Sequence, residues 1–291
     1  MLLPEFLQAS PGCFLLALTL LGLIVGSFLN VVILRLPIMM ERQWKLECLE
    51  ALHPDKVPEN PIKYNLATPG SNCMECGYRI RPWENIPVLS YLFLKGQCSH
   101  CKTPISIRYP LIEIISATLA VVSGIVFGAS TTTLFVCLLA WALLTLTVID
   151  LDTQLLPDSI TLPLLWLGLL VNTQHLFVPL TDAVFGAVAG YLSLWLVYWG
   201  FKLATGKEGM GYGDFKLLAA LGAWLGWQML PLIILLSSLV GTLAGVGLMI
   251  FKKHNREQPI PFGPYLAAAG FFALLWGNTL IEFYLQIMGM K

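Results

Sequence analysis

The chain has 291 residues, of which 57% are hydrophobic and 12% are charged, and its 17 basic and 17 acidic side chains balance. A soluble protein of this length would carry about a quarter charged residues, so the composition excludes an ordinary soluble protein and indicates a membrane protein. We expect membrane lipid, and no nucleic acid, among its partners.

The apolar runs can be tested by length, because a helix needs roughly 20 apolar residues to cross a bilayer. The first run is long, follows no Lys or Arg and contains no small-residue cleavage site, so we interpret it as a span and not as a signal peptide. The sixth run is short and rich in Gly and Ala, which indicates tilting or close packing. We predict eight transmembrane helices, at about 12–34, 109–128, 131–149, 159–177, 183–204, 215–229, 231–251 and 264–288.

The basic residues predict the orientation of these spans. Ten of the 17 Lys and Arg fall between Arg35 and Arg108, and six more lie in two other loops. With eight spans, all sixteen fall on one side of the membrane, and Lys291 alone remains outside this set. The positive-inside rule makes that side the cytoplasm. Both termini are then predicted to face outward.

The segment 35–108 is the one sizeable polar region, and it contains two CxxC pairs that are separated by 21 residues. This is the spacing of a zinc ribbon, in which two tight turns bring four thiolates into a tetrahedron. The alternative is two disulfides or four unrelated thiols, but a cytoplasmic location argues against disulfides. We predict one structural zinc ion bound by Cys73, Cys76, Cys98 and Cys101. Three further cysteines lack this spacing: Cys13, Cys48 and Cys137.

Two aspartates stand at the edges of apolar runs on the same predicted side. Asp150 closes the third span and Asp214 opens the sixth, after Gly211-Tyr212-Gly213. An ionisable group at such a position indicates a functional site, and two carboxylates that share a proton form an acid and base pair. For Asp214, helix capping is the alternative, because an acidic residue after a glycine turn is stabilised by the helix dipole.

Other acidic residues near these positions have structural interpretations. Asp158 follows Pro157 at the start of a span, which favours an N-cap role. Asp152 is a loop charge or modulates Asp150. Glu113 lies just inside the second span, where a structural pairing with an arginine is favoured over a place in the active cavity. Asp182 is predicted to lie on the outer side, away from the site.

Several motifs in one order resemble the bacterial type IV prepilin leader peptidases that also N-methylate the mature pilin. The resemblance covers nearly the whole chain. It rests on Gly26-Ser27-Phe28-Leu29-Asn30-Val31-Val32 with Arg35-Leu36-Pro37, the paired CxxC motifs, Arg108-Tyr109-Pro110 with Glu113, Ile149-Asp150 through Leu156-Pro157-Asp158, and Gly211-Tyr212-Gly213-Asp214-Phe215-Lys216. The Gly-x-Gly-Asp element is also similar to that of presenilin and signal peptide peptidase.

The resemblance implies a multi-pass aspartic endopeptidase of the bacterial inner membrane, with Asp150 and Asp214 as the catalytic residues. Its partners would be prepilins and pseudopilins with a basic leader and a hydrophobic N-terminal helix, cut after glycine at the cytoplasmic face. S-adenosylmethionine would serve as methyl donor, although the sequence contains no Gly-x-Gly-x-x-Gly after a strand that would identify its binding residues.

The fold class predicted is therefore an all-α polytopic membrane protein with a zinc-ribbon-like insertion between its first and second helices. It would consist of a first helix (1–34), a cytoplasmic zinc-binding segment (35–108) and a seven-helix peptidase domain (109–291). The rival function is a transporter or channel that uses intramembrane carboxylates. Against this alternative, the sequence has no evident internal repeat and its carboxylates lie at one surface.

Overall fold

The computed structural model describes residues 10–54, 64–252 and 261–288. Within these ranges, six helices are long and apolar enough to cross a membrane. Two shorter helices, α6 (Asp158–Asn172) and α8 (Tyr212–Leu225), occupy the positions of the fourth and sixth predicted spans. The predicted all-α membrane fold is confirmed. The predicted count of eight full-length spans is only approximate, because six helices in the described residues are long enough to cross a membrane. The six long helices are α2 (Pro11–Leu52), α4 (Arg108–Phe127), α5 (Thr131–Thr153), α7 (Leu180–Thr205), α9 (Leu230–Lys252) and α10 (Gly263–Ile287).

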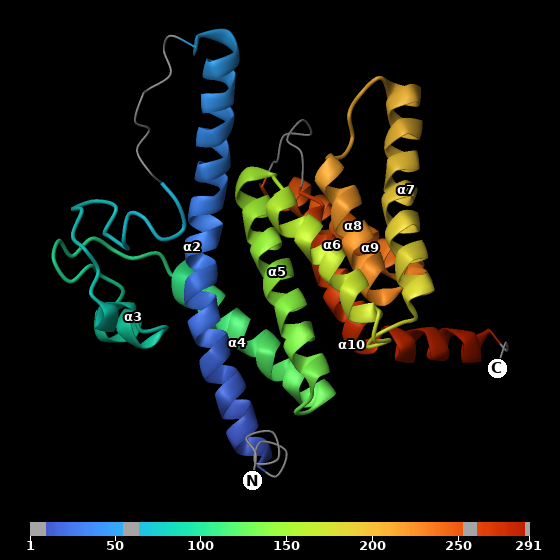
Figure 1. The fold of residues 1–291 in the computed structure, drawn as a ribbon, viewed down its shortest axis with the longest axis horizontal. Helices are drawn as coiled ribbons and strands as arrows, with labels where there is room; N and C mark the ends of the chain where they lie inside the picture. The colour runs from blue at the N-terminus through green and yellow to red at the C-terminus, as the bar shows by residue number, and fades with distance from the viewer. Residues whose placement is uncertain (1–9, 55–63, 253–260, 289–291) are drawn as a thin grey trace. The chain divides into compact units, whose positions relative to one another are not determined.

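The chain divides into two compact units, Met1–Trp141 and Ala142–Lys291, with the boundary inside α5. The first unit is built on the pairing of α2 with α4 (Figure 1). Small residues let these helices approach closely, since a Cβ atom at Gly26 would lie 2.7 Å from the Cα atom of Glu113. The three segments predicted from the sequence remain a prediction, and α2 itself continues beyond residue 34 as far as Leu52.

The segment between α2 and α4 contains only short elements among its described residues 64–107. These are the 3₁₀ helix η2 (Pro82–Asn85) and the short helix α3 (Leu89–Phe93). Two isolated β-bridges, Asn72 with Arg79 and Gln97 with Pro104, close the two cysteine turns. The four-cysteine insertion therefore lies between the first and second long helices, as predicted.

The second unit is organised around α8, which packs against α6, α7 and α10. Residues from Leu217 to Leu225 in α8 are all buried. The α7 and α8 backbones approach closely, because a Cβ atom at Gly190 would lie 2.6 Å from the Leu218 carbonyl oxygen. The Trp224 indole donates a hydrogen bond of 2.8 Å to the Leu164 carbonyl on α6. Of the two alternatives predicted for the short sixth run, tilting or close packing, the structure shows close packing, because protein surrounds this helix.

Candidate active site and metal centre

Asp150 lies in the last turn of α5 and is buried, with 5% of its surface exposed. Its Oδ2 atom accepts a hydrogen bond of 3.0 Å from the backbone N–H of Gly263, the first residue of α10. The first N–H groups of a helix have no partner within the helix. Asp150 therefore satisfies one of these groups, and in return the start of α10 stabilises the negative charge of the carboxylate.

Asp214 lies in the first turn of α8 and is also buried, with 7% of its surface exposed. Gly211 precedes the helix, and its carbonyl accepts a 3.3 Å hydrogen bond from the Asp214 N–H. The carboxylates of Asp214 and Asp150 are close enough to repel each other as like charges. The structure therefore brings together the two aspartates that were selected from the sequence, although they lie 64 positions apart in the chain, on α5 and α8.

Leu156 connects the surroundings of the two aspartates. A Cβ atom at Gly213, next to Asp214, would lie 2.7 Å from the Leu156 Cβ. A Cβ atom at Gly263 would lie 3.1 Å from the Leu156 Cδ2 and 2.6 Å from the Asp150 Oδ2. Both glycines are thus needed for close approach, because any side chain there would displace either Leu156 or Asp150. The pair lies in a tightly packed site.

Lys216 and Asp158 form an ion pair beside this site. The Lys216 Nζ donates to both carboxylate oxygens of Asp158 at 2.7 Å. Asp158 is the first residue of α6, Pro157 is the N-cap, and no side chain caps the helix. The N-cap interpretation of Asp158 is therefore wrong, because its carboxylate reaches across to α8 and not back to its own helix. The ion pair joins the beginning of α6 to the first turn of α8, two residues after Asp214.

Aromatic side chains cover α8 on the side of α7. The rings of Tyr198, Tyr212 and Phe215 contact one another with centroids 5.3 to 5.7 Å apart. Lys202 donates 3.1 Å to the Tyr198 hydroxyl and pairs at 2.8 Å with Glu208. These groups pack the first turn of α8 against α7 and limit the positions that Asp214 can take.

The sequence interpretation missed Gly263, Leu156 and Lys216 as parts of this site. One signal was available for Gly263, which stands between two prolines in Pro261-Phe262-Gly263-Pro264 at the start of the last apolar run. A glycine in such a position indicates close approach of another group. Nothing in the sequence specified that the approaching group was Asp150.

The four cysteines of the insertion form a second cluster, in the first unit. Their sulfur atoms all lie within 4.8 Å of one another, and the Sγ atoms of Cys73 and Cys101 are 3.8 Å apart. Each pair sits on the same kind of turn, since the Cys73 and Cys98 N–H groups donate to the carbonyls of Tyr78 and Thr103, both at 2.9 Å. The cluster could hold a metal ion. Cys13, Cys48 and Cys137 lie outside it.

The thiols of this cluster differ in acidity. The Thr103 hydroxyl, 3.2 Å from the Cys101 Sγ, lowers the pKa of Cys101 to about 6 by hydrogen bonding. At Cys76, a backbone hydrogen bond from Tyr78 lowers the pKa, but partial desolvation and hydrogen bonds with the three neighbouring thiols outweigh it and raise the pKa to about 11. Four thiolates this close together need a cation to neutralise them, and metal binding would release the remaining protons.

Glu113 is buried in α4, where its Oε2 atom accepts a hydrogen bond of 2.7 Å from the backbone N–H of Val88. The Ser27 hydroxyl also hydrogen-bonds this carboxylate. Both contacts lie within the first unit and tie α2, α4 and the insertion together. These contacts support a structural role for Glu113. Its partners are a backbone N–H and a hydroxyl group, whereas an arginine was the expected partner.

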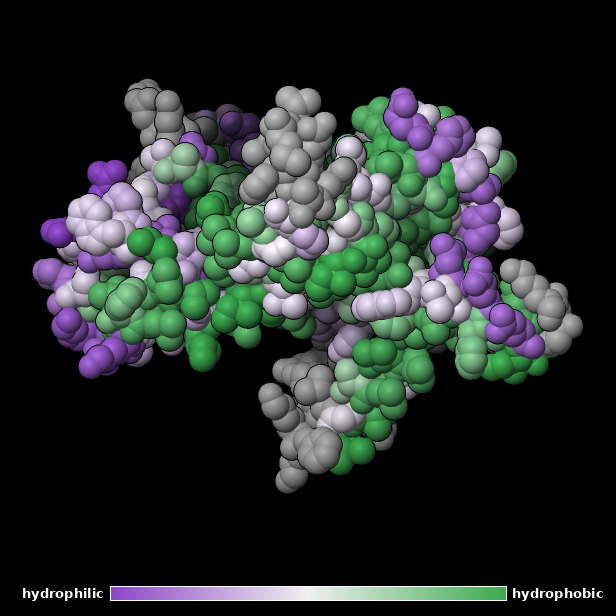
Figure 2. All heavy atoms as spheres, turned by 90° about the horizontal axis from the view of Figure 1, so that it is seen from below, coloured by the Kyte–Doolittle hydropathy of each residue, from purple (hydrophilic) through white to green (hydrophobic). Residues whose placement is uncertain are grey.

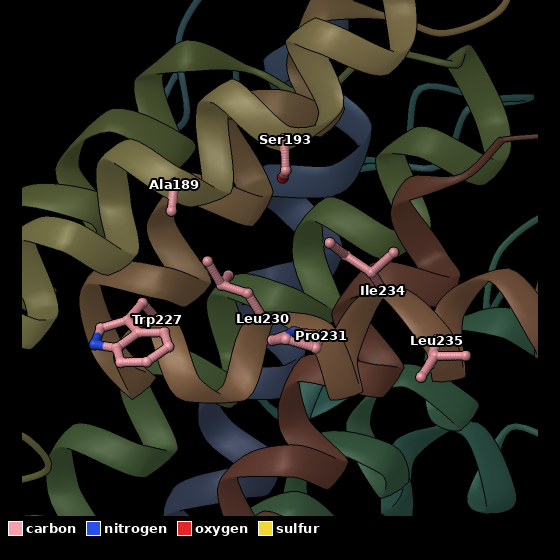
Figure 3. Close-up of a pocket in the computed structure, with 7 residues that line it drawn as sticks. All are labelled: Ala189, Ser193, Trp227, Leu230, Pro231, Ile234 and Leu235. Atoms are coloured by element: carbon pink, nitrogen blue, oxygen red, sulfur yellow. The ribbon is translucent and has the colours of Figure 1, made fainter.

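An apolar groove lies in the second unit between α7 and the beginning of α9 (Figure 3). Its lining is apolar apart from Ser193, whose hydroxyl donates to the Gly190 carbonyl of its own helix at 3.0 Å. The groove contains no acid, base or nucleophile suited to catalysis. It is lined by Ala189, Ser193, Trp227, Leu230, Pro231, Ile234 and Leu235.

These features define a multi-pass membrane protein that has two buried, interacting carboxylates and a separate four-cysteine cluster. Residues 20–127 match the bacterial peptidase A24 N-terminal domain, and residues 137–246 match the type IV leader peptidase family. The chain belongs to this family of enzymes. No solved structure matches it.

Curated relatives extend the match over almost the entire chain. Proteins named prepilin leader peptidase/N-methyltransferase from Pseudomonas aeruginosa and Pseudomonas putida are 57% and 56% identical to it, and each alignment covers at least 99% of both chains. A protein of the same name from Burkholderia pseudomallei is 49% identical over 99% of this chain and 92% of its own. The resemblance identified from the motifs is confirmed.

Proposed function

We propose that this chain is a prepilin leader peptidase that uses Asp150 and Asp214 as an aspartic catalytic pair and also N-methylates the product. The observation that carries the peptidase proposal is the convergence of two buried carboxylates from α5 and α8. A buried charge is costly unless it is paired with an opposite charge, so two buried carboxylates that meet without one indicate a functional site. Here the two groups have the same charge, so a shared proton between them is the natural resting state.

The surroundings of the two aspartates support different roles. Asp150 accepts the Gly263 N–H at the start of α10, which stabilises its ionised form. Asp150 is therefore the general base that takes a proton from the attacking water. Asp214, in its protonated form, donates a hydrogen bond to the scissile carbonyl and polarises it. As the amine leaves, Asp150 returns its proton to the leaving nitrogen.

The substrates proposed are prepilins and pseudopilins with a basic leader and a hydrophobic N-terminal helix. Two findings support this assignment, the family and the names of the relatives. The predicted orientation agrees with it, because it puts both aspartates on the side of the basic loops. The cleavage site after a glycine would then lie at the cytoplasmic face of the inner membrane, within reach of both carboxylates.

The four cysteines are proposed to bind one structural zinc ion. A tetrahedron with Zn–S bonds of about 2.3 Å has edges of about 3.8 Å, which agrees with the 3.8 Å between the sulfurs of Cys73 and Cys101. His100 stacks on Tyr78 with centroids 5.4 Å apart, so its ring has a packing role beside the cluster. A site closed by four thiolates has no position for substrate.

The methyl donor is proposed to be S-adenosylmethionine, as the names of the relatives imply. When bound, S-adenosylmethionine would supply the methyl group that the new N-terminal amine of the pilin receives.

Incubation of the purified chain with a prepilin peptide, a mature pilin and labelled S-adenosylmethionine tests both activities. Release of the leader and labelling of the pilin N-terminus are expected. Ion or solute flux through proteoliposomes without peptide cleavage would instead identify a transporter or channel. The absence of both cleavage and labelling would reject the proposed function.

A further inference from the structure

The insertion exposes large apolar side chains around α3. Phe93 is 83% exposed, and Leu92 and Trp83 are each 63% exposed. Ile86 and Leu89 are exposed as well. α3 is only five residues long, so it has little surface with which to bury such side chains by itself. A concentration of exposed aromatic and aliphatic groups on a polar segment indicates a surface that contacts an apolar partner.

A buried contact fixes the depth of this surface relative to α4. Val88 immediately precedes α3, and its N–H donates to Glu113, one and a half turns into α4. Val88 has a φ angle of 60°, which a β-branched residue rarely adopts. Such a conformation persists only when surrounding contacts stabilise it. The Glu113 hydrogen bond therefore anchors the start of α3 beside the first turns of a membrane-spanning helix.

The first turns of α4 also carry exposed apolar side chains. In Figure 1, α3 lies at the same height along the axis of α2 as the N-terminal turns of α4. In Figure 2, hydrophilic residues line the outer edge of the left-hand part of the molecule, and hydrophobic residues lie beside them farther inward. On α4 itself, Leu111 and Ile114 are exposed, as expected for a helix that faces lipid.

We propose that residues 82–94 form an interfacial foot that inserts its apolar side chains into the bilayer leaflet from which α4 begins. The partner is the phospholipid bilayer, because the Val88–Glu113 hydrogen bond holds this surface at the depth of the first turns of α4, a helix long and apolar enough to cross the membrane. Trp83 and Tyr91 are typical of the membrane interface, where an apolar ring meets a polar edge. Arg81, stacked at 5.5 Å over Trp83, and Lys95 flank the foot and suit contacts with lipid phosphates.

This foot constrains the insertion at two points. One CxxC turn precedes the foot in sequence and the other follows it. When residues 82–94 enter the bilayer, both CxxC turns are therefore held at the membrane surface. Any substrate helix that enters this unit from the bilayer would then meet the insertion at the interface. The foot does not depend on the proposed catalytic residues, which lie in the other compact unit.

Site-specific photocrosslinking of the full-length chain tests the proposal. Phe93 is replaced by p-benzoylphenylalanine, the protein is reconstituted in nanodiscs of phosphatidylethanolamine and phosphatidylglycerol, and adducts are identified by mass spectrometry after irradiation. Met74, which is 85% exposed in the first cysteine turn, is the matched control, and Ile114 on α4 is the lipid-facing reference. Phospholipid adducts are expected at Phe93 and Ile114, several-fold above those at Met74.

Two results would overturn the proposal. One is adduct formation at Ile114 but not at Phe93, repeated with the probe at Leu92 in case one position tolerates the probe poorly. The other is a crosslink from Phe93 to a second copy of the chain, which would identify a protein interface there. Neither readout requires prepilin, S-adenosylmethionine or catalytic activity, so failure of the foot and failure of the proposed function are distinguishable.

Discussion

The backbone N–H of Gly263 donates a 3.0 Å hydrogen bond to the Oδ2 of Asp150, across 113 residues of sequence. This contact gives the two buried aspartates unequal surroundings. The Asp150 carboxylate has a backbone donor at the beginning of α10, whereas no donor to the Asp214 carboxylate from another helix is seen among the described residues. An acid and a base made from two identical side chains need such an asymmetry, because the protein must favour one place for the shared proton.

Asp150→Asn and Asp214→Asn are each expected to lower the rate of leader cleavage by about 100- to 10,000-fold, because each removes one partner of a paired acid and base. Cleavage of a prepilin peptide by the purified variants measures this. Asp182→Asn is the control, since Asp182 accepts a hydrogen bond from Gln228 at the other end of α7. Near-normal cleavage by either of the first two variants would reject the pair.

Gly263→Ala is expected to lower kcat for cleavage by about 100-fold, because a misplacement of about 1 Å in a catalytic group has effects of this size. The added Cβ would lie 2.6 Å from the Asp150 Oδ2, so one of the two must move. Gly200→Ala on α7 is the matched control, as nothing lies within 4 Å of its added Cβ. If both variants cleave at the wild-type rate, Gly263 does not position Asp150.

Lys216→Met and Asp158→Asn are each expected to lower kcat several-fold with little change in KM, since their ion pair holds the first turn of α8 against α6. The pair is half-exposed, so its contribution to the free energy of unfolding should be about 1 kcal/mol or less. A double-mutant cycle on both quantities measures the coupling. Additive effects on kcat would show that the pair does not act as a unit.

Purified protein is expected to contain one zinc ion per chain, measured by elemental analysis. Serine in place of Cys73, Cys76, Cys98 or Cys101 should reduce metal retention, because each removes one of four ligands. The same change at Cys48, which lies outside the cluster, should leave the metal content unchanged. Fully active protein without metal, purified under reducing conditions, would contradict this prediction.

Asp214→Asn is expected to methylate a pre-cleaved pilin at the wild-type rate, because proton transfer between the aspartates has no part in moving a methyl group from sulfur to an amine. Labelled S-adenosylmethionine and mature pilin supply the assay. Variants in the segment 35–108 should instead reduce the label. Loss of transfer in Asp214→Asn alone would mean that the two activities share residues.

The sequence by itself determined the features that depend on local pattern. The apolar runs predicted the helices. The CxxC spacing predicted the four-cysteine cluster, in which the Sγ atoms of Cys73 and Cys101 lie 3.8 Å apart. A charge at the edge of an apolar run is conspicuous wherever the chain folds, so Asp150 and Asp214 could be selected without a structure. The Gly-Ala composition of the sixth run likewise predicted tilting or close packing, and α8 is closely packed.

Only the tertiary structure decided which groups surround those residues. The Gly263 hydrogen bond, the place of Leu156 between two glycines, and the pairing of Asp158 with Lys216 all join segments far apart in the chain. The anchoring of Val88 by Glu113 also required the structure, because a buried glutamate can satisfy its carboxylate with many donors. Sequence periodicity specifies which side of a helix is apolar, whereas the partner that each polar group meets depends on how the helices pack.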